Sequence, residues 1–227
     1  MFFSMIRLRS DVFPKDVAAL SRGGDYGLHK LVWDLFSDGP GRRRDFLYRF
    51  EKVKGLPTFY AVSVRTPIDK AGLWDVNSKP YTPNLVSGDR LSFMVRVNPI
   101  LSKRDGNGRQ QRHDVVMAAK NKIGFKNLPN EQRPHVATLI QEAGLEWLKS
   151  RENEYGFKVS ESGIRADGYC QHTLFKGKGA KPIKFSTLEF NGVLTVAEPA
   201  TFVSKCLYTG IGPAKAFGCG LMLVRRV

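Results

Sequence analysis

Cysteine is scarce in this chain, and long apolar runs are absent. The three cysteines, Cys170, Cys206 and Cys219, show no CxxC spacing, which argues against a zinc site or a disulfide framework and fits a reducing compartment. No stretch approaches the roughly 18 consecutive apolar residues of a membrane-spanning helix. The start MFFSMIRLRS lacks the basic region that precedes the apolar run of a signal peptide. We therefore expect a soluble cytoplasmic protein.

Acidic residues and histidines are also few. The chain has 36 Lys+Arg against 21 Asp+Glu, a net charge of +15. A surplus of this size usually serves a polyanionic partner, most often nucleic acid, although charge that only aids solubility is the alternative. No two of the 4 histidines have metal-ligand spacing, and no carboxylate completes a ligand set. We expect neither a metal site nor a cofactor.

Residue periodicity divides the chain into short strands and helices. In the first hundred residues, alternation and helical spacing predict a helix over 25–36 and strands at 2–9, 44–53, 58–67 and 88–100. In the second half, we predict helices at 133–156 and 198–210. We also predict an extended segment at 157–166, a hairpin at 183–197 that turns at FNG, and a last strand at 220–227.

This order of elements is typical of an α+β fold with two tandem ferredoxin-like (RRM-like) βαββαβ domains. We expect an N-terminal domain over 1–101 and a C-terminal domain over 127–227. The polar, basic and turn-rich stretch 102–126 is expected to be a linker or a long loop between them.

The chain ends in a glycine-rich stretch, TGIGPAKAFGCGLMLVRRV. It does not contain the GxxxxGK[ST] of a P-loop, and it precedes a strand rather than a helix, unlike a dinucleotide-binding fingerprint. Two interpretations remain open: the loop binds an RNA backbone, or it packs tightly against a neighbouring strand. The residues concerned are Gly210, Gly212, Gly218 and Gly220, which surround Lys215.

The first predicted helix carries a candidate catalytic pair. At about 100° per residue, Tyr26, His29 and Trp33 lie together on one flank of the apolar stripe. Tyr26 and His29 are three residues apart, so both side chains can reach one substrate group, and the two residue types suit general acid–base chemistry. The alternative is an ordinary Tyr–His pair at the edge of the core.

Several basic clusters lie mostly in predicted loops. Each alone is usually a solvated surface, but together they favour a path for a phosphate backbone. The clusters are Arg42, Arg43 and Arg44; Lys103, Arg104, Arg109 and Arg112; Lys120, Lys122 and Lys126; and Lys176, Lys178, Lys181 and Lys184.

Five stretches together resemble the CasE-type endoribonucleases that process CRISPR RNA in type I-E systems. The glycine-rich GIGPAKAFGCGLMLV is the most specific, and LHKLVWDLF, RDFLYRFEK, VRVNPI and FNGVLTV agree with it in the same order. The resemblance runs from residue 1 to residue 227. It implies two tandem ferredoxin-like domains, in agreement with the pattern of elements.

The resemblance also implies a function. It implies metal-independent cleavage of CRISPR repeat RNA at the base of its hairpin, giving 5′-hydroxyl and 2′,3′-cyclic phosphate ends. The enzyme is expected to keep its product and to join a Cascade complex, with backbone and 5′-handle-capping subunits as partners and target DNA as an indirect one. The family's catalytic histidine falls on His29, a tyrosine of some members falls on Tyr26, and a lysine of some members falls loosely on Lys52.

Two other functions compete with this hypothesis. A non-catalytic RNA-binding subunit of the same kind of complex would keep the basic surface and the glycine-rich loop without needing Tyr26 and His29 on one flank. A general RNA-binding regulator ranks last, because the aromatic motif of an RRM is missing. A labelled repeat hairpin, incubated in EDTA and examined for a single cut, separates the first two.

Overall fold

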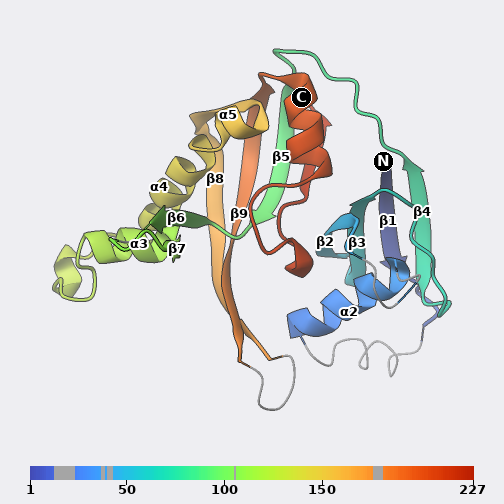
Figure 1. Ribbon diagram of the computed structural model, residues 1–227, viewed down its shortest axis with the longest axis horizontal. Coiled ribbons are helices and arrows are strands. Elements are labelled where there is room, and N and C mark those ends of the chain that lie inside the picture. The colour runs from blue at the N-terminus through green and yellow to red at the C-terminus, as the bar shows by residue number, and fades with distance from the viewer. Residues whose placement is uncertain (13–23, 37–38, 40–42, 105, 176–180) are drawn as a thin grey trace.

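The computed structural model describes residues 1–12, 24–36, 39, 43–104, 106–175 and 181–227, without the side chains of 24–26, 28 and 103. It contains two four-stranded antiparallel sheets, which stand side by side with the C-terminal segment between them (Figure 1). No described helix is long and apolar enough to cross a membrane. The α+β prediction with two ferredoxin-like sheets is confirmed.

The first sheet has the strand order β2-β3-β1-β4, with every neighbouring pair antiparallel. This is the order of a ferredoxin-like βαββαβ unit. The described residues 64–73 between β3 and β4 contain no helix. Its elements are β1 (Phe2–Leu8), α2 (Gly24–Phe36), β2 (Phe46–Val53), β3 (Leu56–Ser63) and β4 (Trp74–Pro80).

Helix α2 covers one face of this sheet, as its apolar stripe predicts. Val32, Leu35 and Phe36 are at most 4% exposed and pack against Phe46 and Phe59 of the strands. Each Å² of apolar surface removed from water contributes about 25 cal/mol to stability, so burial of these side chains holds the helix on the sheet. The flank that carries His29 therefore has a fixed position relative to β2.

The second sheet has the order β10-β5-β9-β8, and it packs on α4 and η2. Read from β5, its elements again follow βαββαβ. They are β5 (Arg90–Val97), α4 (Val136–Lys149), α5 (Glu152–Tyr155), β8 (Phe157–Leu174), β9 (Ile183–Val196), α6 (Pro199–Thr201), the π-helix η2 (Phe202–Tyr208), the 3-10 turn η3 (Lys215–Phe217) and β10 (Met222–Arg226).

The prediction placed strand 88–100 in the N-terminal domain, and this placement was wrong. Strand β5 pairs with β9 and β10 of the second sheet. Alternation identifies a strand but carries no information about its partners, because pairing depends on residues a hundred positions away. This pairing argues for a domain boundary before Arg90 rather than at residue 101.

The predicted turn at FNG was also wrong. FNG does not turn, because β9 continues through Asn191 and Gly192. A Cβ on Gly192 would lie 2.1 Å from the Gly163 carbonyl oxygen, so this glycine admits the irregular part of β8 that faces it. The hairpin instead joins β8 to β9, and its long arms extend beyond the rest of the sheet (Figure 1).

The expected linker 102–126 contains regular structure. It forms a two-stranded hairpin and a helix, which project from the second sheet (Figure 1). The hairpin escaped prediction because QQRHD is exposed along almost its whole length and so has no apolar alternation. A short 3-10 helix, η1, follows; the four elements are β6 (Ile100–Arg104), β7 (Gln110–Asp114), α3 (Val115–Lys122) and η1 (Asn130–Gln132).

Candidate functional site

His29 lies on the second turn of α2, half-buried against the C-terminal loop. Its Nδ1 is 2.6 Å from the carbonyl oxygen of Ala216. A carbonyl oxygen only accepts hydrogen bonds, so Nδ1 carries the proton and, in the neutral ring, Nε2 is the basic nitrogen. This contact therefore fixes both the tautomer and the direction of the ring.

Tyr48 of β2 also donates a hydrogen bond to this carbonyl group. Its hydroxyl donates to the Ala216 oxygen over 2.9 Å, and the residue is 2% exposed. The oxygen that orients His29 is thus anchored independently of His29. The prediction missed Tyr48, because nothing in RDFLYRFEK marks its hydroxyl as the partner of a group 168 residues away.

A column of aromatic rings connects His29 to the second sheet. The ring centroids of His29 and Phe217 are 5.6 Å apart, those of Phe217 and Phe185 are 5.0 Å apart, and those of Phe185 and His172 are 4.7 Å apart. On its other side His29 meets Trp33 at 5.8 Å. The imidazole of α2 is therefore held by the C-terminal loop, which itself contacts β2 through Tyr48 and β9 through Phe185.

The glycine-rich loop packs against β2. Gly210, Gly218 and Gly220 are buried, and Gly212 is half-buried. All four have φ between +71° and +93°, where a side chain costs about 1–2 kcal/mol. A Cβ on Gly210 would lie 2.8 Å from Leu47 Cδ1. The packing interpretation describes this loop, and RNA contact by its glycines stays a prediction.

Two glycines of the loop form a matched pair for a stability test. A Cβ on Gly220 would lie 2.8 Å from the Ile211 carbonyl oxygen, whereas a Cβ on Gly212 would meet nothing nearer than 3.6 Å. We expect Gly220→Ala to lower the melting temperature clearly more than Gly212→Ala. Both variants place an alanine at a left-handed φ, which is strained, but only Gly220→Ala adds a clash with the backbone. Equal melting temperatures for the two variants would contradict this account.

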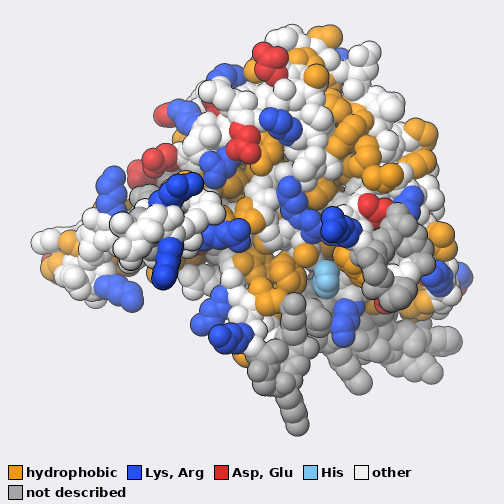
Figure 2. Space-filling model, viewed as in Figure 1, with side chains coloured by type: hydrophobic (Ala, Val, Ile, Leu, Met, Phe, Trp, Pro, Cys, Tyr) orange, Lys and Arg blue, Asp and Glu red, His pale blue; other side chains and the backbone are white. Residues whose placement is uncertain are grey.

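Positive charge gathers where the two sheets meet. In Figure 2, Lys and Arg side chains occupy the middle of the face shown, whereas most visible acidic side chains lie toward the end of the molecule that carries α4 and α5. Lys215 of η3 is half-buried, and burial together with the nearby Arg44 charge lowers the pKa of its ammonium group. Burial also lowers the pKa of Arg44. Two like charges held together in this way favour an anion between or beside them.

The other predicted RNA-binding residues fall into two groups. Those that the structure describes are exposed and therefore accessible: Arg43, Arg104, Arg109, Arg112 and Lys181. Arg104 and Arg112 extend from the β6–β7 hairpin, and Lys181 precedes β9. Arg42, Lys176, Lys178 and the side chain of Lys103 lie outside the described part of the chain.

The remaining catalytic candidates are less closely placed. The side chain of Tyr26 lies outside the described residues. Lys52 is exposed on β2, on the same face of the strand as Tyr48 but four residues further along, which is about 13 Å at the rise of a strand. The structure thus brings His29, Lys215 and Tyr48 to one loop, and the roles of Tyr26 and Lys52 stay predictions.

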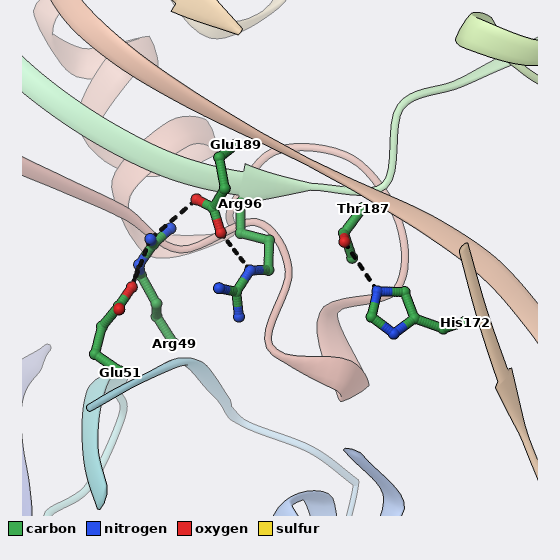
Figure 3. A network of polar contacts seen from close by, with 6 residues as sticks. All are labelled: Arg49, Glu51, Arg96, His172, Thr187 and Glu189. Carbon is green, nitrogen blue, oxygen red and sulfur yellow. Dashed lines mark hydrogen bonds and ion pairs between the residues drawn. The ribbon is translucent and has the colours of Figure 1, made fainter. Parts of the chain in front are cut away.

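A buried ion network joins the two sheets beside this site. Arg49 of β2 contacts Glu51 at 2.5 Å and Glu189 of β9 at 2.9 Å, and Arg96 of β5 contacts Glu189 at 2.5 Å (Figure 3). The Arg49 side chain is 4% exposed, and its Nη1 is buried without a hydrogen-bond partner among the described residues. The strands of both sheets therefore share one cluster of charge, in which Arg49 is enclosed while Glu51 and Arg96 are each 30% exposed.

Comparison with known proteins gives one consistent family. The model of a family described as "CRISPR associated protein" matches residues 1–226. The chain is 31% identical to the "CRISPR system Cascade subunit CasE" of Escherichia coli K12 over 200 residues, which covers 87% of this chain and 89% of that protein. It is 28% identical to the "CRISPR-associated endoribonuclease Cse3" of Thermus thermophilus over 215 residues, covering 88% and 89%.

Solved structures agree on the fold. The chain matches a structure described as the "CRISPR endoribonuclease Cse3 bound to 19 nt RNA" with a TM-score of 0.68 and 23% identity, covering 99% of this chain and 100% of that one. It matches the crystal structure of the "CRISPR-associated protein Cas6e" from Escherichia coli K-12 with a TM-score of 0.59 and 22% identity, covering all of both chains. At these identities the likeness establishes the arrangement of the two sheets.

Proposed function

Because this chain belongs to the family of CRISPR-associated proteins, we propose that it is an endoribonuclease that cleaves CRISPR repeat RNA at the base of its hairpin. It keeps the cleaved product and takes part in a Cascade complex. Similarity to the CasE of Escherichia coli and to the Thermus thermophilus endoribonuclease supports this proposal. The observation that carries it is His29, whose tautomer and direction are fixed by a carbonyl group beside the half-buried cation Lys215.

We propose that the RNA supplies its own nucleophile. The 2′-hydroxyl attacks the adjacent phosphorus, so a 2′-O–P bond forms and the bond to the 5′-oxygen breaks. The 2′-hydroxyl loses one proton, and the departing 5′-oxygen gains one. The products are a 2′,3′-cyclic phosphate and a 5′-hydroxyl. Nε2 of His29 suits either proton transfer, because Nδ1 is held by Ala216.

The charge that develops on the phosphate needs a cation. Lys215 is the neighbour of Ala216 in sequence and lies near Arg44, so both cations belong to the surroundings of His29. Cations held in a partly desolvated site stabilise a developing negative charge more strongly than cations in open water. The exposed arginines of the β6–β7 hairpin are more suited to holding the RNA backbone than to the reaction.

The test uses a labelled repeat hairpin with and without EDTA. We expect one cut at the base of the stem in both conditions, a 5′-hydroxyl on the downstream fragment, and a cyclic phosphate on the upstream one. A hairpin with a 2′-deoxy nucleotide at the cut should bind with the same affinity and stay intact. Binding without any cut would favour the non-catalytic RNA-binding subunit, and cleavage of the deoxy hairpin would exclude the cyclic-phosphate mechanism.

Lys215 offers a quantitative test of RNA contact. We expect Lys215→Met to weaken binding of every hairpin to a similar degree and to reduce the slope of log affinity against log salt by about 1. Lys205→Met, at an exposed position on η2, is the matched control and should leave both quantities unchanged. A salt slope identical to the wild-type value for Lys215→Met would remove this residue from the RNA interface.

A further inference from the structure

A cavity lies next to the proposed catalytic site, beyond the end of β5. It has a volume of about 450 Å³ and is formed where the long β8–β9 hairpin continues past the sheet and meets β7. Its walls include Asn98, Arg112, His172, Lys184 and Phe185. The ring column connects it to His29, because Phe217 touches both Phe185 and His29.

Asn98 provides an unsatisfied acceptor in this wall. The residue is 7% exposed, and its Oδ1 atom is buried without a hydrogen-bond partner among the described residues. Leaving such an atom unpaired costs about 1–3 kcal/mol, and native proteins contain few of them. A ligand that donates a hydrogen bond here would remove that cost.

The cavity also presents an aromatic ring, that of His172, whereas Phe185 is stacked between His172 and Phe217. His172 and Phe185 are directly opposite one another in the β8–β9 register, and their rings stack with an interplanar angle of 11°. His172 Nε2 is 2.9 Å from Thr187 Oγ1, which fixes the imidazole on its strand (Figure 3). A rigid aromatic ring of this kind is what single-stranded nucleic-acid sites use to stack a base.

The charges around the cavity suit a nucleotide. Arg112 and Lys184 are exposed cations at its edge, and both can reach a phosphate. The carboxylate in the wall, Asp114, is already engaged: it accepts from the Met117 amide at the start of α3 and from the Ser186 hydroxyl. Two cations against one carboxylate leave the edge of the cavity with a net positive charge, which suits a phosphate.

We propose that this cavity binds one unpaired nucleobase with an exocyclic amine, from a nucleotide that flanks the RNA hairpin. The amine donates to Asn98 Oδ1, the base packs against the His172 ring, and its phosphate faces Arg112 and Lys184. This inference rests on the proposed function, since it assumes that the strand cut at His29 passes the cavity. It gives the enzyme a means of reading a base outside the paired stem.

The test replaces each unpaired nucleotide flanking the stem in turn by an abasic one and measures the dissociation constant with the wild-type protein. We expect one position to weaken binding about tenfold, because one stacked and hydrogen-bonded base contributes about 1–3 kcal/mol. At that position, replacing the base by its analogue without the amine should give most of the same loss. An abasic scan that changes no dissociation constant overturns the proposal.

Asn98→Leu tests the protein side. We expect it to weaken binding of the intact hairpin several-fold and to leave binding of the abasic hairpin unchanged, since the interaction is already absent there. Asn77→Leu, at an exposed position of β4, is the matched control and should change neither. Equal losses of Asn98→Leu on both hairpins contradict the proposal. If Asn98→Leu does not fold, the amine-free hairpin with wild-type protein decides alone.

The two proposals fail in different ways. If the wild-type protein neither binds nor cuts the repeat hairpin, the proposed function is wrong. If it binds and cuts the hairpin normally while the abasic scan is flat, only the nucleobase cavity is wrong.

Discussion

His29→Ala is expected to slow cleavage of the repeat hairpin by about 10²–10⁴-fold, the usual contribution of a positioned acid or base. Hairpin affinity should change little, because the charges around the loop come from other residues such as Lys215 and Arg44. Single-turnover cleavage and equilibrium binding, measured on the same preparation, separate the two effects. Cleavage at the wild-type rate by His29→Ala sinks the assignment.

His29 also supports the loop, so a second variant must separate support from proton transfer. An asparagine amide nitrogen can take the place of Nδ1 and donate to Ala216, but it supplies no basic nitrogen. We expect His29→Asn to lose as much activity as His29→Ala while keeping a melting temperature near that of the wild type. His135→Ala, at an exposed position before α4, should cleave normally and controls for loss of a histidine.

Tyr48→Phe tests the positioning of the imidazole. The phenyl ring keeps the packing against Phe46 and Phe59, but the Ala216 carbonyl loses its second donor. We expect a loss of cleavage rate of about tenfold, well below that of His29→Ala, since the proton-transfer group itself remains. A loss as large as that of His29→Ala would mean that Tyr48 contacts the reacting groups directly.

The sequence predicts well what depends on neighbouring residues. The apolar stripe of α2 follows from spacing, so the half-buried position of His29 could be anticipated from residues 25–36 alone. The hairpin of β2 and β3 is equally local, because the turn residues Lys54 and Gly55 take the positive φ values that such turns require. Each of these features depends on residues that are close together in the sequence.

What the sequence does not predict depends on partners far along the chain. The carbonyl of Ala216 meets His29 across 187 positions, and no pattern in either segment announces the other. Asn98 follows a strand and looks like an ordinary loop residue, yet the fold buries its oxygen. The glycine spacing of the C-terminal loop was visible, but only the approach of Leu47 and Tyr48 explains why it packs as it does.

The ion network between the sheets could not be predicted from the sequence either, because charges at alternate strand positions usually indicate a solvated face. Arg49 instead points from β2 into the contact between the sheets, where Glu189 and Arg96 face it as a cross-strand pair. Burying charge is unfavourable unless it is paired, so removing one partner costs more than the pair contributes. This asymmetry makes the network a sensitive test of how the two sheets are held together.

Glu189→Gln is therefore expected to destabilise the protein by about 1.5–3 kcal/mol, the contribution of hydrogen bonds between charged groups, because Arg49 keeps Glu51 as a counter-ion. At roughly 2–4 °C per kcal/mol for a chain of this size, the melting temperature should fall by about 3–12 °C. Glu161→Gln is the matched control, since Glu161 pairs with Lys149 at the surface and its side chain is 71% exposed. This control should have the same melting temperature as the wild type.

The double variant Arg49→Met with Glu189→Leu completes the argument. Apolar side chains of similar volume need no compensating charge, and Glu51 and Arg96, which lose their partners, are each 30% exposed to water. The double variant should therefore recover most of the stability lost in Glu189→Gln. It also removes the charged link between β2 and β9 while keeping their packing. If packing alone holds the sheets in position, the folded double variant should cleave the hairpin at the wild-type rate. If the charges also set the position of β2, and with it Tyr48 and His29, stability returns without the cleavage rate.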